Sequence, residues 1–78
     1  MEDIVLINIT GRDRTGLNAC FAGILARYDV RILDIGQSVI HEHISLGILA
    51  AIPCKQDFSA VFKDMLFEGY KLGLKVDI

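Results

Sequence analysis

Blocks of apolar and polar residues along the chain predict an alternation of strands and helices. A continuous apolar run indicates a first strand over residues 3–10. Because such runs are typical of central strands, we expect it to be buried on both faces. Apolar side chains at steps of three and four then predict a helix over residues 15–28, with Thr15 as its N-cap and Gly16 as its first residue. Its apolar stripe comprises Leu17, Cys20, Phe21, Ile24, Leu25 and Tyr28.

The middle of the chain changes to a period of two. Strands are predicted over residues 31–42 and 44–53, joined by a hairpin near His41, Glu42 and His43. Both faces of the later strand are apolar or small, so we expect it at the centre of the sheet, with Pro53 at its end. One face comprises Ile44, Leu46, Ile48, Ala50 and Ile52, and the other comprises Gly47, Leu49 and Ala51.

A second helix is predicted over residues 57–70, with Asp57 as its N-cap. Its apolar stripe comprises Phe58, Val61, Phe62, Met65, Leu66 and Tyr70. A last strand follows Gly73 and places Leu74, Val76 and Ile78 on one face. Because the chain ends inside this strand, we expect residues 1–78 to be a single domain that is a fragment of a longer protein.

This order of elements predicts a ferredoxin-like α+β sandwich, in which an antiparallel four-stranded sheet carries two helices on one face. Right-handed crossovers place the first and third strands in the centre. Of the 78 residues, 53% are hydrophobic, which is a large share for so small a core. We therefore expect the uncovered sheet face or the second strand to be buried against a second copy or a neighbouring domain.

The charge balance excludes several classes of partner. The net charge is −2 and no basic face stands out, which argues against nucleic-acid binding. No apolar run is long enough to span a membrane, and the start of the chain lacks the basic residues of a signal peptide. We expect a cytoplasmic protein, in which Cys20 and Cys54 stay reduced and Cys20 is a core thiol.

The residues offer no credible catalytic set. His41 and His43 lie two apart and face the same side of a strand, but two imidazoles are too few for a zinc site, and exposed hairpin residues are the favoured interpretation. Ser45 lacks an orienting partner for nucleophilic catalysis. We expect neither catalysis nor a cofactor or metal in these 78 residues.

The segment from Gly11 to Leu17, with the sequence GRDRTGL, is the strongest candidate for a site. It joins the first strand to the first helix, and the unpaired N–H groups of a helix start attract carboxylates and other anions. The alternative is that its glycines only permit the turn and its charges are solvated. A second candidate is the segment 33–38, in which Asp34 and Gln37 are suited to an amino group or an amide. There Gly36 indicates a bulge or a close backbone approach, and the alternative is an exposed edge strand.

The same GRDRTGL segment resembles the G-x-D-[RK]-P-G-[LI] signature at the first loop of ACT domains, which are small ferredoxin-like regulatory modules that bind amino acids. Thr15 stands where the family usually has proline. A narrower likeness, carried by ILDIGQSVIH at residues 32–41 and by LGIL at residues 46–49, is similar to the N-terminal ACT domain of bacterial phosphoserine phosphatases. In such a parent, a haloacid-dehalogenase-type hydrolase domain that uses magnesium would follow downstream and carry the catalysis.

The resemblance implies a ligand site between two ACT domains, in a homodimer or with a neighbouring domain. Asp13, Arg14, Thr15 and Gly16 would line it from one side, and Asp34, Ile35 and Gln37 would face it from the other. Serine or a similar small amino acid is the implied effector, which makes the leading hypothesis an amino-acid-sensing module of a phosphoserine phosphatase. The alternative is a stand-alone ACT protein or accessory subunit of a regulator, acting by protein contacts without a ligand. An acylphosphatase-type enzyme is a poorer match, because Asn8 does not fit its catalytic asparagine.

Overall fold

Strands and helices follow each other in the order that the sequence predicts. The structure, a computed structural model, describes residues 2–53 and 58–78, and these form four strands and two helices. The elements are β1 (Glu2–Arg12), α1 (Leu17–Arg27), β2 (Arg31–Ile40), β3 (His43–Pro53), α2 (Phe58–Lys71) and β4 (Lys75–Asp77). The predicted Asp57 N-cap and Cys54 lie outside the described residues.

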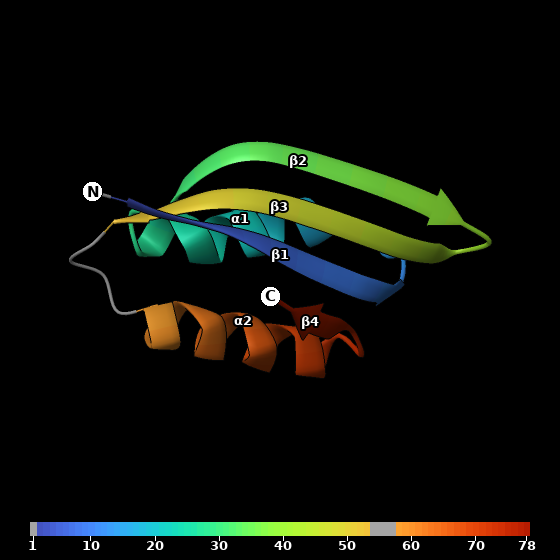
Figure 1. Cartoon of the computed structure of the whole chain (residues 1–78). Coiled ribbons are helices and arrows are strands. Elements are labelled where there is room, and N and C mark those ends of the chain that lie inside the picture. The colour runs from blue at the N-terminus through green and yellow to red at the C-terminus, as the bar shows by residue number, and fades with distance from the viewer. Residues whose placement is uncertain (1, 54–57) are drawn as a thin grey trace.

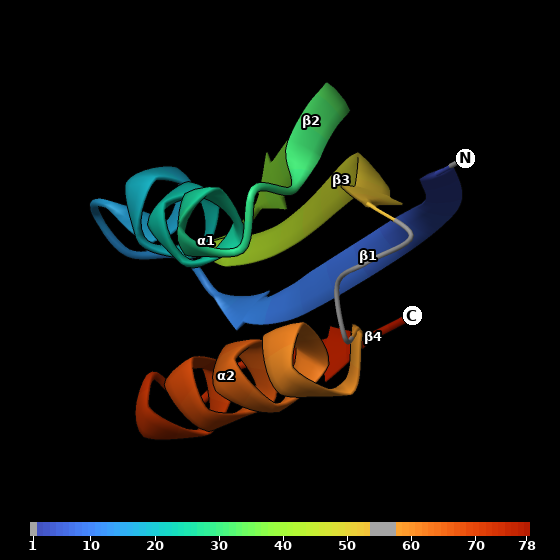
Figure 2. The same ribbon diagram turned by 90° about the vertical axis from the view of Figure 1, so that its left-hand side faces the viewer.

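The strands form one antiparallel sheet in the order β2-β3-β1-β4, so β1 and β3 are central, as predicted. These two strands pair over their whole length, from Glu2 opposite Pro53 to Arg12 opposite His43. Both helices lie on the same side of the sheet, which confirms the ferredoxin-like α+β sandwich (Figures 1 and 2). The opposite side, here called the open face, carries no helix (Figure 2).

The hydrophobic core lies between the sheet and the helices. Ile7 and Ile9 of β1 are fully buried there, as are Phe21 and Leu25 of α1. The other buried members are Leu17, Ile24, Val30, Ile44, Leu46, Ile48, Ala50, Ile52, Val61, Met65, Leu74 and Val76. Burying a side chain of this size stabilises the fold by about 2 kcal/mol, so this layer is the main source of stability.

Burial of β1 on both faces, which the apolar run predicted, is wrong for this chain. Side chains alternate between the two faces of a strand, so every second residue of β1 points to the open face. Ile4 is 64% exposed and Leu6 is 50% exposed there. The apolar run therefore indicates that β1 is a central strand. Its apolar side chains on the open face are not covered by a helix.

The start of α1 differs from the prediction. β1 continues through Gly11 and Arg12, and the N-cap of the helix is Gly16, not Thr15. Gly16 adopts a left-handed conformation with φ of 87°, which a threonine would enter only with strain. No side chain caps this end, and the helix begins at Leu17.

The stripe predicted for α2 is only partly buried. Val61, Met65 and Gly69 are buried, whereas Leu66 and Tyr70 are exposed. The helix rests on the sheet through Gly69, where an added Cβ would lie 2.6 Å from Val76 Cγ2. Because α2 contacts the sheet along the side that includes Gly69, the larger side chains of Leu66 and Tyr70 lie outside the core. On α1, Cys20 is half-buried, so the predicted core thiol is corrected to a residue at the edge of the core.

The β2–β3 hairpin is tight. β2 ends at Ile40, and His41 and Glu42 form the turn with φ values of 48° and 65°. The irregularity expected near Gly36 lies instead between Ile32 and Asp34. Because one extra residue in a strand reverses the alternation of its side chains, this bulge decides which residues of β2 face the helices.

Candidate functional site

The loop between β1 and α1 is held against the β2–β3 turn. The backbone N–H of Asp13 donates a hydrogen bond of 2.7 Å to the carbonyl oxygen of Glu42. The Arg12 guanidinium also contacts the Glu42 carboxylate, at 3.3 Å. Both side chains are more than three-quarters exposed, so this ion pair adds at most about 1 kcal/mol, and the backbone bond fixes the loop.

A hollow of about 330 Å³ lies where this loop, the start of α1 and β2 meet. Asp13, Arg14 and Gly16 line it from the loop, and Gln37 lines it from β2. The Nδ2 of Asn18 donates a hydrogen bond of 2.9 Å to the Oε1 of Gln37, which orients that amide. The first N–H groups of α1 point toward this end of the helix. Because no side chain caps them, they suit an anionic group.

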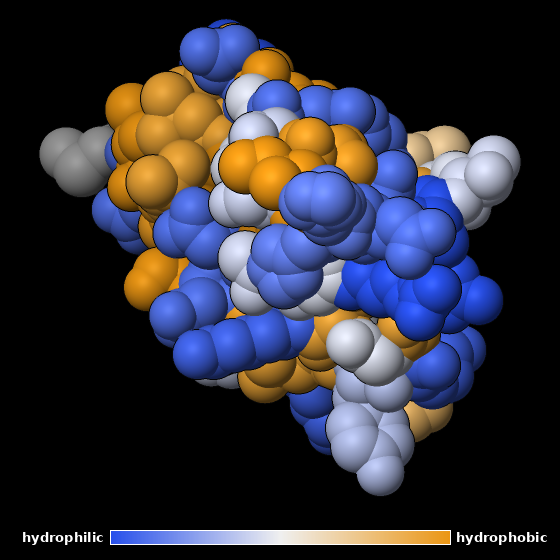
Figure 3. All heavy atoms as spheres, turned by 90° about the vertical axis from the view of Figure 1, so that its right-hand side faces the viewer, coloured by the Kyte–Doolittle hydropathy of each residue, from blue (hydrophilic) through white to orange (hydrophobic). Residues whose placement is uncertain are grey.

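Thr15 faces a neighbouring hollow on the outer side of the loop. Arg12, Asp13, Arg14 and Glu42 line the same hollow. Figure 3 looks onto this end of the molecule and shows a mainly hydrophilic surface with apolar patches between the polar groups. The guanidinium groups of Arg12 and Arg14 suit a carboxylate, and both side chains are exposed to solvent.

The remaining candidates, Asp34 and Ile35, do not reach the hollow beside Gly16. Asp34 pairs with Leu49 and lies on the open face, where its Oδ1 accepts a hydrogen bond of 2.9 Å from the N–H of Ile35. Ile35 pairs with Ile48 on the helix side and is 41% exposed. Within one chain the structure thus brings Asp13, Arg14, Gly16 and Gln37 together and leaves Asp34 apart. Ligand binding by any of the seven residues stays a prediction.

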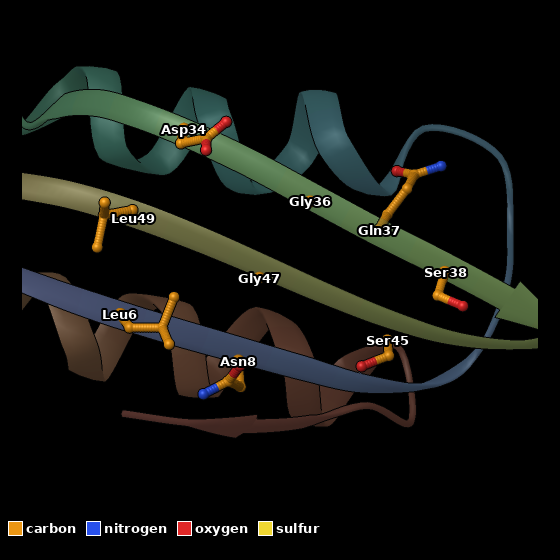
Figure 4. Close-up of a pocket in the computed structure, with 9 residues that line it drawn as sticks. All are labelled: Leu6, Asn8, Asp34, Gly36, Gln37, Ser38, Ser45, Gly47 and Leu49. Atoms are coloured by element: carbon orange, nitrogen blue, oxygen red, sulfur yellow. The ribbon is translucent and has the colours of Figure 1, made fainter.

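A larger hollow, of about 530 Å³, lies on the open face and was missed from the sequence (Figure 4). Its floor is the pair Gly36 and Gly47, which lie opposite each other on β2 and β3. The residues that line it are Leu6, Asn8, Asp34, Gly36, Gln37, Ser38, Ser45, Gly47 and Leu49. The signal that would have found it is the position of two glycines in neighbouring strands, but their register had to be known first.

The groove between α1 and α2 holds the shifted titratable groups. Burial and the Glu68 carboxylate, whose Oε2 lies 3.7 Å from the Cys20 Sγ, raise the pKa of the Cys20 thiol. A hydrogen bond to Asp64 raises the pKa of the Tyr28 phenol. A raised thiol pKa disfavours the thiolate, so Cys20 is poorly suited to act as a nucleophile. Over the described ranges, no group of three histidine, cysteine, aspartate or glutamate side chains is arranged to hold a metal ion.

Comparison with known proteins gives the family. The model of the ACT domain family matches residues 3–78, nearly the whole chain. This chain belongs to the ACT domain family. The loop with the family-like GRDRTGL segment is therefore the first loop of an ACT domain, and the hollow beside Gly16 lies at that loop.

The relatives of this ACT chain include both short and long proteins. A UPF0237 protein of Clostridium acetobutylicum is 31% identical over 74 residues, which cover 94% of this chain and 83% of the relative. Phosphoserine phosphatase SerB2 of Mycobacterium tuberculosis is 33% identical over 75 residues, or 95% of this chain but only 18% of that enzyme. The solved ACT domain protein from Streptococcus pneumoniae, 27% identical, superimposes with a TM-score of 0.80 over 95% of this chain and 84% of its own.

Because the chain belongs to the ACT domain family, it is a regulatory domain. No helix in the described part of the chain has the length and apolar composition needed to cross a membrane. The similarity to SerB2 is confined to a fifth of that enzyme, so it carries the ACT domain and not the catalysis.

Proposed function

We propose that this ACT chain is a small regulatory protein that acts through contacts with other protein chains. Its similarity extends over most of the length of the UPF0237 protein but over only 18% of SerB2. The relatives therefore favour the stand-alone or accessory type of ACT protein over a module of a phosphoserine phosphatase.

The observation that carries this proposal is the exposed edge of β2. Within the described residues it pairs on one side only, with β3, and every residue from Leu33 to Ile40 is exposed. The exposed side chains include Leu33, Ile35 and Val39, each more than 40% accessible. An edge strand of this length presents unpaired N–H and C=O groups, and proteins usually protect such edges with lysine, proline or a covering loop. From Ile35 to Ile40, beyond its bulge, β2 contains no charged residue and no proline, which favours pairing with another chain.

Light scattering across a concentration series tests the proposal. We expect the wild-type chain to associate at high micromolar concentration, and Val39→Lys to lower the mass because a charge on the edge opposes strand pairing. Ala26→Lys, on the exposed side of α1, is the matched control and should leave the mass unchanged. A wild-type chain that stays monomeric over the whole series would contradict the proposal.

A second candidate function, sensing of an amino acid such as serine, is favoured by the hollow beside Gly16. Uncapped N–H groups of α1 and the Arg14 guanidinium suit an α-carboxylate, and Asp13 suits an α-ammonium group. Gln37 would add an amide from β2. This function is compatible with the first, since a ligand that favours one arrangement of two chains shifts that population.

Calorimetry with a panel of amino acids tests the sensor. We expect heat with serine or a similar small amino acid, and its loss in Gly16→Asp, because a carboxylate at the helix start repels the ligand carboxylate. Gly73→Asp is the matched control, since Gly73 also has a positive φ, of 73°, and open space around its Cβ position. An absence of both heat and thermal shift with the wild-type chain would reject the sensor and leave the contact function standing.

A further inference from the structure

The first strand has an unpaired backbone edge beyond the short fourth strand. β1 pairs with β3 along its whole length, from Glu2 to Arg12, but β4 pairs with β1 only from Asn8 to Thr10. In Figure 1 the C end accordingly lies well short of the start of β1. Among the described residues, the stretch of β1 from Glu2 to Ile7 therefore has no strand on its second side, and this stretch is here called the β1 edge.

The β1 edge offers backbone hydrogen-bonding groups to a partner. In an antiparallel sheet, successive residues of a central strand direct their N–H and C=O groups to opposite neighbours. Every second residue from Glu2 to Ile7 therefore points both groups away from β3. The part from Ile4 to Ile7 has the apolar sequence IVLI, without the lysine or proline that usually protects an exposed edge. Such an edge favours the addition of a strand.

Apolar side chains of α2 lie along the line that an added strand would follow. Gly69 faces β4, since its Cβ position lies 2.6 Å from Val76 Cγ2. Phe62 and Leu66 precede Gly69 at helical spacing, so they lie on the same side of α2. Because the chain reverses between α2 and β4, these earlier residues of α2 lie beside the continuation of β4. Phe62 is half-buried and Leu66 is 42% exposed, so an apolar side chain of an added strand would have contacts there.

The start of the β1 edge is acidic. The Glu2 carboxylate is already paired with the Arg31 guanidinium, at 2.7 Å, whereas Asp3 is exposed and forms no ion pair with a described residue. Asp3 lies on the same face of β1 as Val5, which packs against the core. Opposite charges across two neighbouring strands stabilise their pairing. A strand on this edge is therefore complementary if it carries lysine or arginine beside Asp3.

We propose that the β1 edge binds an extended segment of another protein, which adds to the sheet in line with β4. The segment would pair with the six residues from Glu2 to Ile7, direct apolar side chains toward α2 and place a basic residue beside Asp3. In recognition of this kind, the backbone gives affinity and alternate side chains give specificity. The inference goes beyond the proposed function, because it concerns a different edge of the sheet and a different partner, a peptide strand.

A synthetic peptide tests the inference. The probe is the capped hexapeptide Val-Thr-Val-Thr-Arg-Thr, whose valines and arginine share one face of a strand and whose arginine reaches Asp3 when the peptide runs in the direction of β4. In the free, dilute chain we expect every second amide from Glu2 to Ile7 to exchange rapidly with solvent by NMR. With the peptide at about ten times its Kd, the exchange of these amides should slow by about tenfold.

Two methylated peptides test whether the backbone forms the contact. Each is N-methylated at alternate residues, so that the two peptides together cover all positions. Because only one set of N–H groups of an added strand points to β1, one peptide should lose binding and the other should keep it. Equal loss with both peptides would contradict strand addition, since contacts of side chains alone do not follow this alternation.

A charge reversal tests the position of the basic residue. We expect Asp3→Lys to weaken binding of the arginine peptide by about fivefold and to strengthen binding of a peptide with glutamate in that place. Asp34→Lys is the matched control, because it reverses the same charge on β2, at the far edge of the sheet, and should leave binding unchanged. An unchanged preference in Asp3→Lys would overturn this position.

The outcomes separate this inference from the proposed function. Peptide binding with the expected alternation supports it whether or not Val39→Lys lowers the mass of the wild-type assembly. Amides that are already protected in the free, dilute chain would show that the β1 edge is covered, and protection that appears only as the chain is concentrated would show a second copy there. Either result, or no binding with millimolar peptide, would overturn the inference and leave the proposed function standing.

Discussion

At the scale of single residues, the β2–β3 turn stores backbone strain. His41 and Glu42 both have positive φ, the conformation of a type I′ hairpin turn, in which Asn-Gly is the preferred pair. Side chains other than Gly, Asn and Asp enter this region at a cost. The turn also holds the first loop through the bond from Asp13 N–H to the Glu42 carbonyl, so this strain lies beside the candidate ligand site.

Replacing the turn pair should stabilise the chain. We expect His41→Asn combined with Glu42→Gly to raise the free energy of unfolding by about 1 kcal/mol, because the new residues adopt positive φ more readily. Glu42→Gln removes the exposed ion pair with Arg12 but keeps the strain, so it should change stability by less than about 0.5 kcal/mol. Urea unfolding compares the variants, and a destabilised double variant would show that these side chains contribute more than the turn strain costs.

At the scale of elements, α2 packs closely against the sheet at Gly69, because this residue has no side chain to hold the helix away from β4. Gly69 faces β4, with its Cβ position 2.6 Å from Val76 Cγ2 and 3.4 Å from the Leu74 carbonyl. Valine is stiff at χ1 and a carbonyl cannot yield, so the contact leaves no room for a methyl group. The pairing of β4 with β1 spans only Asn8 to Thr10, so this contact with α2 is important for its position.

Two glycine-to-alanine substitutions in helices should therefore have opposite effects. Gly69→Ala is expected to destabilise the chain by about 1–3 kcal/mol through overpacking. Gly23→Ala, on α1 with no atom within 4 Å of the added Cβ, is expected to stabilise it by about 1 kcal/mol through helix propensity. Thermal unfolding of both variants gives the comparison, and a stable Gly69→Ala would mean that α2 moves easily over the sheet.

At the scale of the whole molecule, the exposed surface is the feature that calls for a partner. Helices cover one side of the sheet and the open face keeps Ile4 and Leu6 accessible, while the β2 edge keeps Ile35 and Val39 accessible. A monomer would leave both surfaces in water, although apolar surface of this extent usually marks interaction sites.

Association through these surfaces should couple stability to concentration. Because assembly occurs only in the folded state, we expect the midpoint of thermal unfolding to rise with protein concentration for the wild-type chain. The dependence should weaken in Val39→Lys and stay unchanged in Ala26→Lys. A midpoint that is constant over the series would contradict association at either surface.

The sequence predicted the order of elements because its apolar spacing changes between the periods of strand and helix. It also predicted the central strands, and the family from GRDRTGL, since those residues lie together along the chain. It placed the N-cap at Thr15 because threonine is a common cap, whereas the path of β1 through Gly11 makes Gly16 the capping residue with positive φ.

Only the tertiary structure decided which candidates share a site. Asp34 and Gln37 are three residues apart, so alternation places them on opposite faces of β2. The bulge between Ile32 and Asp34 reverses the alternation that starts at Arg31, and this reversal puts Asp34 on the open face and Gln37 beside Asn18. No spacing in the sequence reveals that reversal, because it arises from the register of β2 against β3. The glycine pair under the open face depends on the same register, since Gly36 and Gly47 are remote along the chain and meet only when the strands pair.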